Sequence, residues 1–325
     1  MYICFHAGAY GSGLANNGGT RTIVRSSKVI RKLGHKCDIV ARHDKYKWDR
    51  HPKCVKRVPA DADIMIAVSA RDLKNTNRCC VQKNAWWMRG IETWQYREDP
   101  KSYASPAARE NWLVERAKLM PIIVNATHLR TWLLKRGISS TVCFAGLDLK
   151  QWYEEPGLKP KKIRVGCLYH SRHKTKRWDR FEQLRRFYAF HDHRAPEFVA
   201  FGYGTPPNTD GLTEYLDNPS PDELRRLYSS CHVWFAPTES EGFHNVAAEA
   251  ALCGALVICM DTPHNGMGDY CNDETAVLGY DLNDVEYAFE NPPLERVKVM
   301  QEYLKDHIGS REKNMKKFME IVESL

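Results

Sequence analysis

The chain has 325 residues and a formal net charge of +8, with a hydrophobic content of 43% and a charged content of 27%. The length suits two domains of ordinary size, and the composition is that of a soluble globular protein. No apolar run approaches the length of a membrane span, and the start of the chain is too short and too polar for a signal peptide, so we expect neither a transmembrane segment nor a secretory signal.

The cysteines and the basic residues restrict the environment in which the protein works. The chain has 11 cysteines, with no Cys-x-x-Cys pair and no recurrent spacing. Free thiols in a reducing cytosol fit this pattern better than disulfides or zinc, so we expect a cytoplasmic protein. Basic residues gather in segments 42–57 and 172–194. They predict a solvated basic surface, or else contact with an anionic membrane or with nucleic acid.

The start of the chain predicts a strand–helix–strand unit. Residues 2–5 and 37–41 are apolar runs of strand length, and apolar residues at helical spacing occupy 20–33 between them. Gly18 and Gly19 stand directly before this helix. Because glycine has no Cβ and the first N–H groups of a helix have no acceptor within it, a ligand can approach the backbone there.

A tryptophan-rich segment follows in the first half. Buried strands are predicted at 62–68 and 121–126, and segment 84–94 between them holds three tryptophans. Core packing is one interpretation of these side chains. The other is stacking on a sugar or a base, helped by nearby arginine.

Segment 154–162, with two prolines and a glycine, is typical of an interdomain linker. A strand at 163–168 follows, and then a basic loop over 170–177. Further on, a strand at 198–203 leads into a Gly-x-Gly turn, and Ser220 with Pro221 predicts the start of a helix.

A second strand–helix–strand unit lies around residue 245. Apolar runs at 232–236 and 255–259 flank a helix predicted over 245–253, which Gly254 ends. Ligands of open α/β sheets bind beyond the carboxyl ends of the strands, and a helix N-terminus favours a phosphate. The loop between the first strand and the helix is therefore the strongest candidate for a binding site.

Two glutamates accompany that loop. Glu241 lies within it, and Glu249 follows eight residues later, which is about two helical turns further and hence on the same helix face. With Gly242 and Phe243 after the first glutamate, this run resembles the Glu-x7-Glu signature of family 4 retaining glycosyltransferases with the GT-B fold. The resemblance implies an α/β protein of two Rossmann-like domains that face each other across a cleft.

The resemblance also divides the chain. It implies an N-terminal acceptor domain at 1–155 and a C-terminal nucleotide-sugar-binding domain at 156–307. A final helix at 308–325 is expected to pack back on the first domain.

In the second domain the resemblance implies that Glu241 contacts the donor sugar and that Glu249 contacts the ribose. The backbone after Glu241 would hold the sugar and the diphosphate, which assigns donor binding to Gly242, Phe243, His244, Asn245 and Val246. His244 departs from the family, which usually has glycine at this position.

Other donor contacts follow from the same resemblance. Arg172 and Lys176 would neutralise the diphosphate, with Lys174 as the fallback for Lys176, and Gly202 would lie near the base. Cations at this place stabilise the charge that develops on a leaving diphosphate. A basic helix start with no ligand is the alternative.

In the first domain the resemblance implies that Gly18 and Gly19 lie against the donor phosphate and the acceptor. Arg89 and Glu92 are candidates for contact with the donor sugar or the acceptor.

The implied reaction is transfer of a sugar from a nucleoside diphosphate sugar, such as a UDP- or GDP-sugar, to an acceptor hydroxyl with retention. No metal and no cofactor are expected. The acceptor is a glycan or lipid-linked glycan, with peripheral contact to an anionic membrane, or else DNA that carries a hydroxymethylated base. A non-catalytic nucleotide-sugar-binding protein is the alternative from another class.

Overall fold

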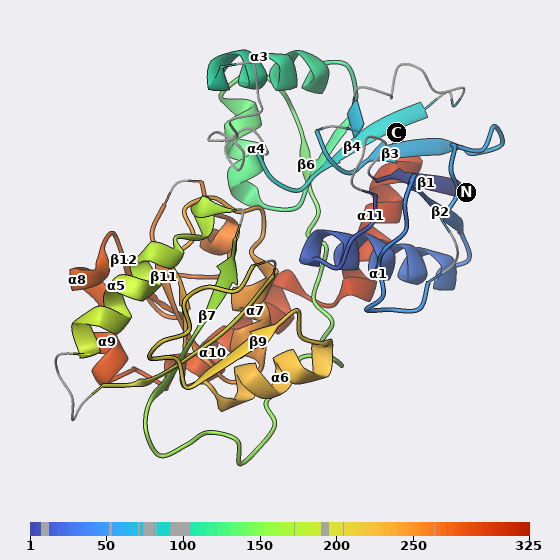
Figure 1. Cartoon of the computed structure of the whole chain (residues 1–325). Coiled ribbons are helices and arrows are strands. Elements are labelled where there is room, and N and C mark those ends of the chain that lie inside the picture. Colours follow the sequence, from blue (N-terminus) through green and yellow to red (C-terminus); the bar gives the residue numbers. More distant parts are fainter. Residues whose placement is uncertain are drawn as a thin grey trace. The chain divides into compact units, whose positions relative to one another are not determined.

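Two parallel β-sheets organise the chain, one in each of two units. The computed structural model describes residues 1–7, 13–51, 54–70, 72–73, 81, 83–91, 105–171, 173–189, 195–203, 205–262 and 264–325. Unit 1 consists of Met1–Gly146 and Ser310–Leu325, and unit 2 consists of Leu147–Gly309. Figure 1 shows both units in the colours of the sequence.

Unit 1 is built on a six-stranded sheet of order β2-β1-β3-β4-β5-β6 in which every pair is parallel. Its strands are β1 Tyr2–His6, β2 Lys36–Val40, β3 Ile64–Ala67, β4 Lys83–Met88, β5 Ile122–Val124 and β6 Thr141–Val142. Its helices are α1 Gly18–Lys32, α3 Pro106–Ala117, α4 Thr127–Leu134 and α11 Arg311–Ser324.

The two faces of this sheet are covered by different helices. Ile23 of α1 and Phe318 of α11 share one buried cluster with Phe5 of β1, and these two helices lie together in Figure 1. Residues of α3 and α4 share another cluster with Met88 and Ile122. Because neighbouring side chains of a strand point to opposite faces, Trp87 packs in the first cluster and Trp86 in the second. Core packing is therefore the correct interpretation of these two tryptophans.

Unit 2 is built on a six-stranded parallel sheet of order β12-β11-β10-β7-β8-β9. Its strands are β7 Arg164–His170, β8 Glu197–Tyr203, β9 Glu214–Asp217, β10 Val233–Ala236, β11 Leu256–Met260 and β12 Val277–Gly279. Its helical segments are η2 Lys174–Lys176, α5 Trp178–Ala189, α6 Pro221–Ser230, α7 Asn245–Leu252, η3 Gly266–Asp269, α8 Leu282–Val285, α9 Tyr287–Glu290, α10 Arg296–Tyr303 and the π-helical turn η4 Leu304–Ile308.

The order in which successive strands are added to this parallel sheet reverses at strand β7. Strand β7 pairs with β8, the next strand in the chain, on one side and with β10 on the other. The loops after β7 and β10 consequently leave the sheet in a position where ligands of open α/β sheets bind. These are the basic loop and the loop that holds Glu241.

Several local predictions are confirmed. Helix α6 begins at Pro221 with a capping box between Ser220 and Glu223. Helix α7 ends at Leu252, and Gly254 has a φ of 92°, which is the left-handed conformation expected of glycine after a helix. Strands β10 and β11 pair in parallel, so the strand–helix–strand unit is present as predicted.

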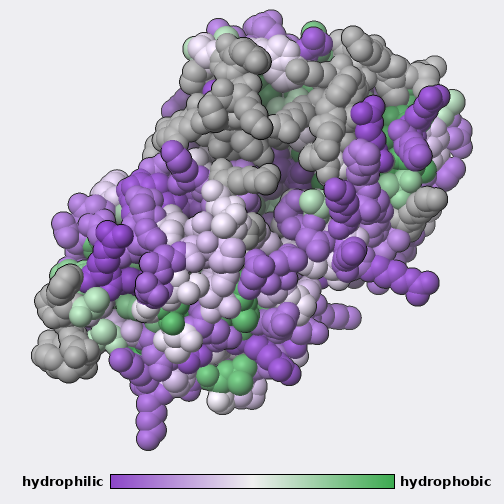
Figure 2. All heavy atoms as spheres, in the orientation of Figure 1, coloured by the Kyte–Doolittle hydropathy of each residue, from purple (hydrophilic) through white to green (hydrophobic). Residues whose placement is uncertain are grey.

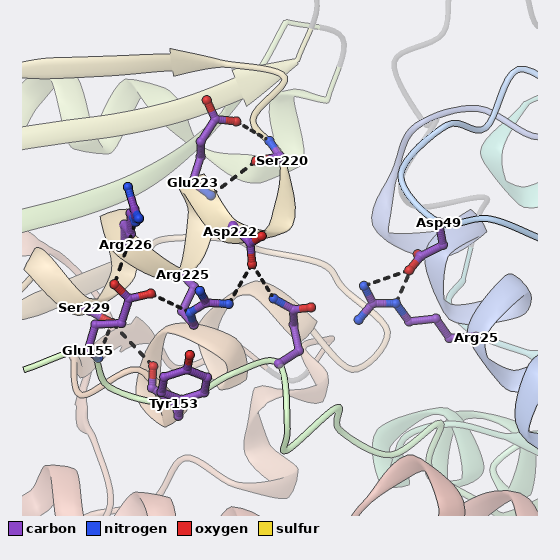
Figure 3. Close-up of polar contacts among 11 residues, drawn as sticks. Arg25, Asp49, Tyr153, Glu155, Ser220, Asp222, Glu223, Arg225, Arg226 and Ser229 are labelled. Carbon is purple, nitrogen blue, oxygen red and sulfur yellow. Dashed lines mark hydrogen bonds and ion pairs between the residues drawn. The ribbon is translucent and has the colours of Figure 1, made fainter.

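The unit boundary lies at Gly146, earlier than the expected residue 155, because the intervening segment packs on α6. Arg225 of α6 donates to Glu155 at 2.7 Å and lies 4.8 Å from the centre of the Tyr153 ring. The N–H of Glu155 donates to Ser229 Oγ at 3.0 Å. Figure 3 shows Arg225 between Glu155 and Asp222.

The last helix also begins later than expected. Ile308 ends η4, Gly309 has a φ of 77°, and α11 starts at Arg311 in unit 1. A Cβ on Gly146 would meet Arg311 Cα at 2.5 Å, so the backbones approach closely where α11 begins.

The surface in Figure 2 is predominantly hydrophilic, with apolar side chains in small patches. Among the described residues, no helix combines the length and the apolar character that crossing a membrane requires. The described cysteines are free thiols, and all of them except Cys54 are buried.

Candidate functional site

The candidate site of unit 2 is built from the loops after β7 and β10, which three contacts join. Arg177 forms ion pairs with Glu239 and with Asp179. The N–H of Glu239 donates to Thr175 O at 2.9 Å. Because β7 and β10 are neighbours in the sheet, residues far apart in the sequence meet here.

The third contact is an ion pair between Lys176 Nζ and Glu241 Oε1. The two side chains are 17% and 16% exposed, so water screens the pair only in part. Lys176, which is predicted to bind the diphosphate, is therefore in direct contact with Glu241, which is predicted to bind the donor sugar. The roles themselves stay predictions.

Burial lowers the pKa of Lys176 to about 7, because desolvation disfavours the charged ammonium. The carboxylate of Glu241 acts in the opposite direction, since an adjacent negative charge favours the ammonium. A bound diphosphate would act in the same direction as Glu241. At neutral pH the charge of Lys176 thus depends on the negative groups beside it, which are Glu241 and, when bound, the diphosphate.

A third loop, between β11 and η3, supports the other two. Asn265 Nδ2 donates to Thr238 O, and Thr262 Oγ1 donates to Glu239 O, both at 2.8 Å. Asn265 also forms an isolated backbone bridge with Glu241. At Gly266 a Cβ would lie 1.6 Å from Gly242 O, so only glycine permits this close approach of the two backbones.

His244 caps α7 and has the left-handed conformation, with a φ of 57° and a ψ of 62°. This conformation explains why glycine would suit the position, since few L-residues adopt it without strain. His244 Nδ1 accepts from the N–H of Ala247 at 3.3 Å, which places the ring proton on Nε2, where Thr238 Oγ1 lies at 3.3 Å. Burial and the adjacent Lys176 hold the pKa of His244 well below its usual value, so the ring is neutral.

The two glutamates do not share a helix face, contrary to the prediction from their spacing. Helix α7 starts at Asn245, and His244 interrupts the helical backbone, so Glu241 does not share a helix face with Glu249. Glu241 reaches the site because its backbone is bridged to Asn265. Glu249 lies in the second turn of α7 with 4% of its surface exposed.

The remaining backbone groups of the loop suit an anion. Gly242 and Phe243 are buried, and Asn245 and Val246 are the first two residues of α7. The N–H groups of these two helical residues have no acceptor within the helix. These N–H groups and the helix dipole favour an anion at the carboxyl end of β10, where Lys176 also lies in contact with Glu241.

The other predicted donor contacts differ in their placement. Lys174 is exposed, although it lies in the same short helix as Lys176. Gly202 is buried within β8, where a Cβ would meet Tyr215 Oη at 2.5 Å and Tyr169 Cβ at 3.0 Å. Packing of these two tyrosines explains this glycine. Arg172 lies outside the described residues.

In unit 1, Gly18 and Gly19 open α1, which Asn17 caps by accepting from the N–H of Thr20 at 2.8 Å. Arg89 donates to Gly19 O at 2.7 Å and to Val68 O at 3.0 Å. Arg89 therefore joins the loop after β3 to the start of α1. Glu92 lies outside the described residues.

Three polar side chains that the sequence analysis missed meet at the carboxyl ends of β1 and β3. His6 Nδ1 is 3.2 Å from Asp72 Oδ1, and Ser69 Oγ donates to Asp72 Oδ2 at 2.6 Å. His6 ends β1, and the other two follow β3, so this group joins the carboxyl ends of two paired strands. The residues are 66 positions apart, and no local pattern signals their contact.

Two Rossmann-like units within one chain are the architecture of the GT-B fold. No protein-family model matches the chain, and no curated protein matches its sequence. Sucrose-phosphate synthase from Thermosynechococcus elongatus matches in structure, with a TM-score of 0.78 and 13% identity over 99% of this chain and 98% of that one.

Two further solved structures have the same fold. HepE from Anabaena, in complex with UDP-glucose, matches with a TM-score of 0.73 and 12% identity, over 100% of both chains. The catalytic domain of starch synthase IV from Arabidopsis thaliana, bound to ADP and acarbose, matches with a TM-score of 0.65 and 10% identity, over 99% of both chains. At these identities the likeness establishes the fold.

Proposed function

We propose that the protein is a retaining glycosyltransferase of the family 4 type, which takes its sugar from a nucleoside diphosphate sugar. The observation that supports this most is the contact of Lys176 with Glu241 beside the start of α7. A cation and free helix N–H groups suit a diphosphate, while a carboxylate suits the hydroxyls of a sugar. The structures with bound UDP-glucose and ADP support a nucleotide donor by analogy of fold.

The transfer exchanges one bond at the anomeric carbon for another. The bond from this carbon to the diphosphate oxygen breaks, and the bond to the acceptor oxygen forms on the same face. The proton of the acceptor hydroxyl goes to the leaving diphosphate, which is the base in this proposal. Lys176 and the N–H groups of α7 stabilise the charge that develops on that leaving group.

Donor turnover tests the proposal directly. We expect a thermal-shift screen of nucleoside diphosphates and their sugars to identify ligands that raise the melting temperature, since a ligand that binds only the folded state stabilises it. Release of the diphosphate from the best donor would then be measured with a glycan acceptor. Binding without any release would favour the non-catalytic nucleotide-sugar-binding protein.

The proposed chemistry uses no metal in the donor site. Turnover should therefore be independent of added Mn²⁺ or Mg²⁺. A strict requirement for either ion would contradict this part of the proposal, because the positive charges of the protein would then not be sufficient for the leaving group.

We propose a glycan or lipid-linked glycan as the acceptor, on the resemblance to family 4. The basic residues of the chain keep modified DNA as a second candidate. A gel-shift titration with duplex DNA over a range of salt concentrations separates the two, because binding through phosphates weakens steeply with salt. No retention of DNA at low salt would remove the second candidate.

A further inference from the structure

Three residues of unit 1 with metal-binding side chains lie together beside β2. They are Asp44, His51 and Cys54, and their ligand atoms are all within 4.8 Å of one another. Asp44 Oδ1 and His51 Nε2 are 3.4 Å apart, with the side chains 31% and 6% exposed. The cluster is thus closed on the histidine side and open to solvent on the aspartate side.

The backbone holds both ends of the segment that contributes these side chains. Asp44 forms a parallel bridge with Leu14, and Val55, which follows Cys54, forms one with Val40 of β2. Two of the three side chains therefore start from positions tied to the rest of unit 1. Fixed backbone positions reduce the entropy that is lost when side chains gather around an ion.

Side-chain contacts hold the middle of the segment. Arg25 of α1 donates through Nε and Nη2 to the two oxygens of Asp49 at 3.1 and 3.2 Å, as Figure 3 shows. The hydroxyl of Tyr46 also donates to Asp49. The ring of His51 lies against Tyr46, with 5.7 Å between the ring centres. His51 is thereby positioned by a packed aromatic ring, which the partly buried Arg25–Asp49 ion pair fixes in turn.

From this arrangement we infer that Asp44, His51 and Cys54 form a binding site for Zn²⁺, with water as the fourth ligand. Carboxylate, imidazole and thiolate are the ligands of zinc, whereas a sulfur ligand disfavours Mg²⁺ and Ca²⁺. In a tetrahedron with bonds of about 2.1 Å, two ligand atoms are about 3.4 Å apart, and Asp44 and His51 have that separation.

Zn²⁺ binding would release the proton of the Cys54 thiol to solvent, while Asp44 enters as the carboxylate and His51 as the neutral imidazole. The site would fasten segment 44–54 to the edge of the sheet. It is separate from the donor chemistry proposed for unit 2.

The sequence alone does not indicate a metal site at Asp44, His51 and Cys54. Their spacing, Asp-x6-His-x2-Cys, contains no Cys-x-x-Cys pair, and the segment is predominantly basic. The sequence analysis predicted no metal, and the cysteines as a set favoured free thiols over zinc. The proposal departs from that expectation for Cys54, the exception to burial among the described cysteines.

The test is metal binding by the full chain. The protein would be purified, dialysed against a chelator and titrated with Zn²⁺ by calorimetry, and with Co²⁺ followed by absorbance. We expect one Zn²⁺ per chain, with release of a proton, and a thiolate-to-cobalt charge-transfer band in the near ultraviolet. Zn²⁺ should also raise the melting temperature of the chelated protein.

Variants assign the site. Cys54→Ser should remove the cobalt band, and Asp44→Asn and His51→Gln should weaken Zn²⁺ binding by about 100-fold or more, given that changes outside the first ligands alone cost 10- to 100-fold. His43→Gln is the matched control, because His43 is an exposed neighbour of Asp44 outside the cluster. Asp44→Asn changes an exposed side chain, so it keeps the test valid if a cysteine variant folds poorly.

Two results would overturn the inference. One is a wild-type chain that binds no Zn²⁺ at micromolar concentrations, which would leave Asp44 and His51 as a simple ion pair. The other is a cobalt band that persists in Cys54→Ser or disappears in His43→Gln, which would place the metal on other residues. Circular dichroism of each variant checks that the fold is retained.

Discussion

Replacing Lys176 by methionine removes one charge from the candidate donor site while keeping most of the side-chain volume. In the wild-type protein the ammonium contacts Glu241, and each side chain is about one-sixth exposed, at 17% and 16%. In the proposed complex the ammonium binds the diphosphate of the donor. The variant therefore tests whether this cation acts on the leaving group or only holds Glu241.

The expected magnitude follows from these two contacts. A hydrogen bond from a charged donor contributes roughly 1.5–3 kcal/mol, so its loss should lower kcat/KM by about 10- to 150-fold. Breaking a fully buried ion pair costs roughly 3–5 kcal/mol, and breaking an exposed one about 0–1 kcal/mol. For a mostly buried pair we expect a loss of about 1–3 kcal/mol in the free energy of unfolding.

The assay has two parts, with Lys174→Met as the matched control. Diphosphate release under kcat/KM conditions measures the transition state, and calorimetric titration with UDP or GDP measures binding. Lys174 lies in the same short helix but is exposed, so its replacement should leave both quantities within about twofold of wild type. Urea unfolding of both variants separates a loss of stability from a loss of catalysis.

Two outcomes would refute the reasoning. If Lys176→Met keeps wild-type turnover and nucleotide affinity, the cation does not contact the diphosphate, and the pair with Glu241 is structural. If Lys174→Met loses turnover and nucleotide affinity and Lys176→Met does not, Lys174 is the residue that binds the diphosphate. In the first case the positive charge at the start of α7 would have to come from the backbone alone.

Three further predictions concern the same site. Because the pKa of Lys176 is about 7, the free protein loses this charge as the pH rises, whereas a bound diphosphate favours the ammonium. Nucleotide affinity of the wild type should therefore fall by up to about tenfold per pH unit above 7, while the affinity of Lys176→Met should not change with pH. Binding titrations from pH 6 to 9 would measure both. Glu249→Gln should weaken donor binding by about 10- to 150-fold with the fold intact, and wild-type affinity of this variant for the nucleoside diphosphate sugar would contradict the ribose contact. In urea unfolding, His244→Ala should be less stable than His244→Gly by roughly 1 kcal/mol, since glycine adopts the left-handed conformation freely and is tolerated as a helix cap. A more stable alanine variant would show that this conformation carries no strain.

Local sequence patterns predicted the elements of this protein well. The apolar runs identified the strands on either side of α7, and Gly254 marked the end of that helix. Ser220 and Pro221 marked the start of α6. These predictions succeed because caps, glycine turns and apolar periodicity act over only a few residues. The two parallel sheets follow from the alternation of strands and helices.

The same local reasoning failed where the backbone leaves regular structure. The two-turn spacing from Glu241 to Glu249 assumed a continuous helix, and the left-handed His244 interrupts it. The boundary between the units was placed too late because the linker composition of 154–162 does not reveal that Tyr153 and Glu155 pack on α6. Side chains of α6, a distant part of the sequence, decide the second of these features.

The sequence by itself determined several of the strands and helices, among them α7 and the strands on either side of it, where α6 begins and α7 ends, and that Glu241 follows a strand of a parallel sheet. Only the tertiary structure decided that Lys176 meets Glu241, that His6 meets Asp72, and that three potential metal ligands gather beside β2. The physical reason is that such contacts depend on which strands are neighbours. Strand β7 pairs with β10 across almost 70 residues of intervening chain, from Val165 to Val233, and no local periodicity encodes that choice.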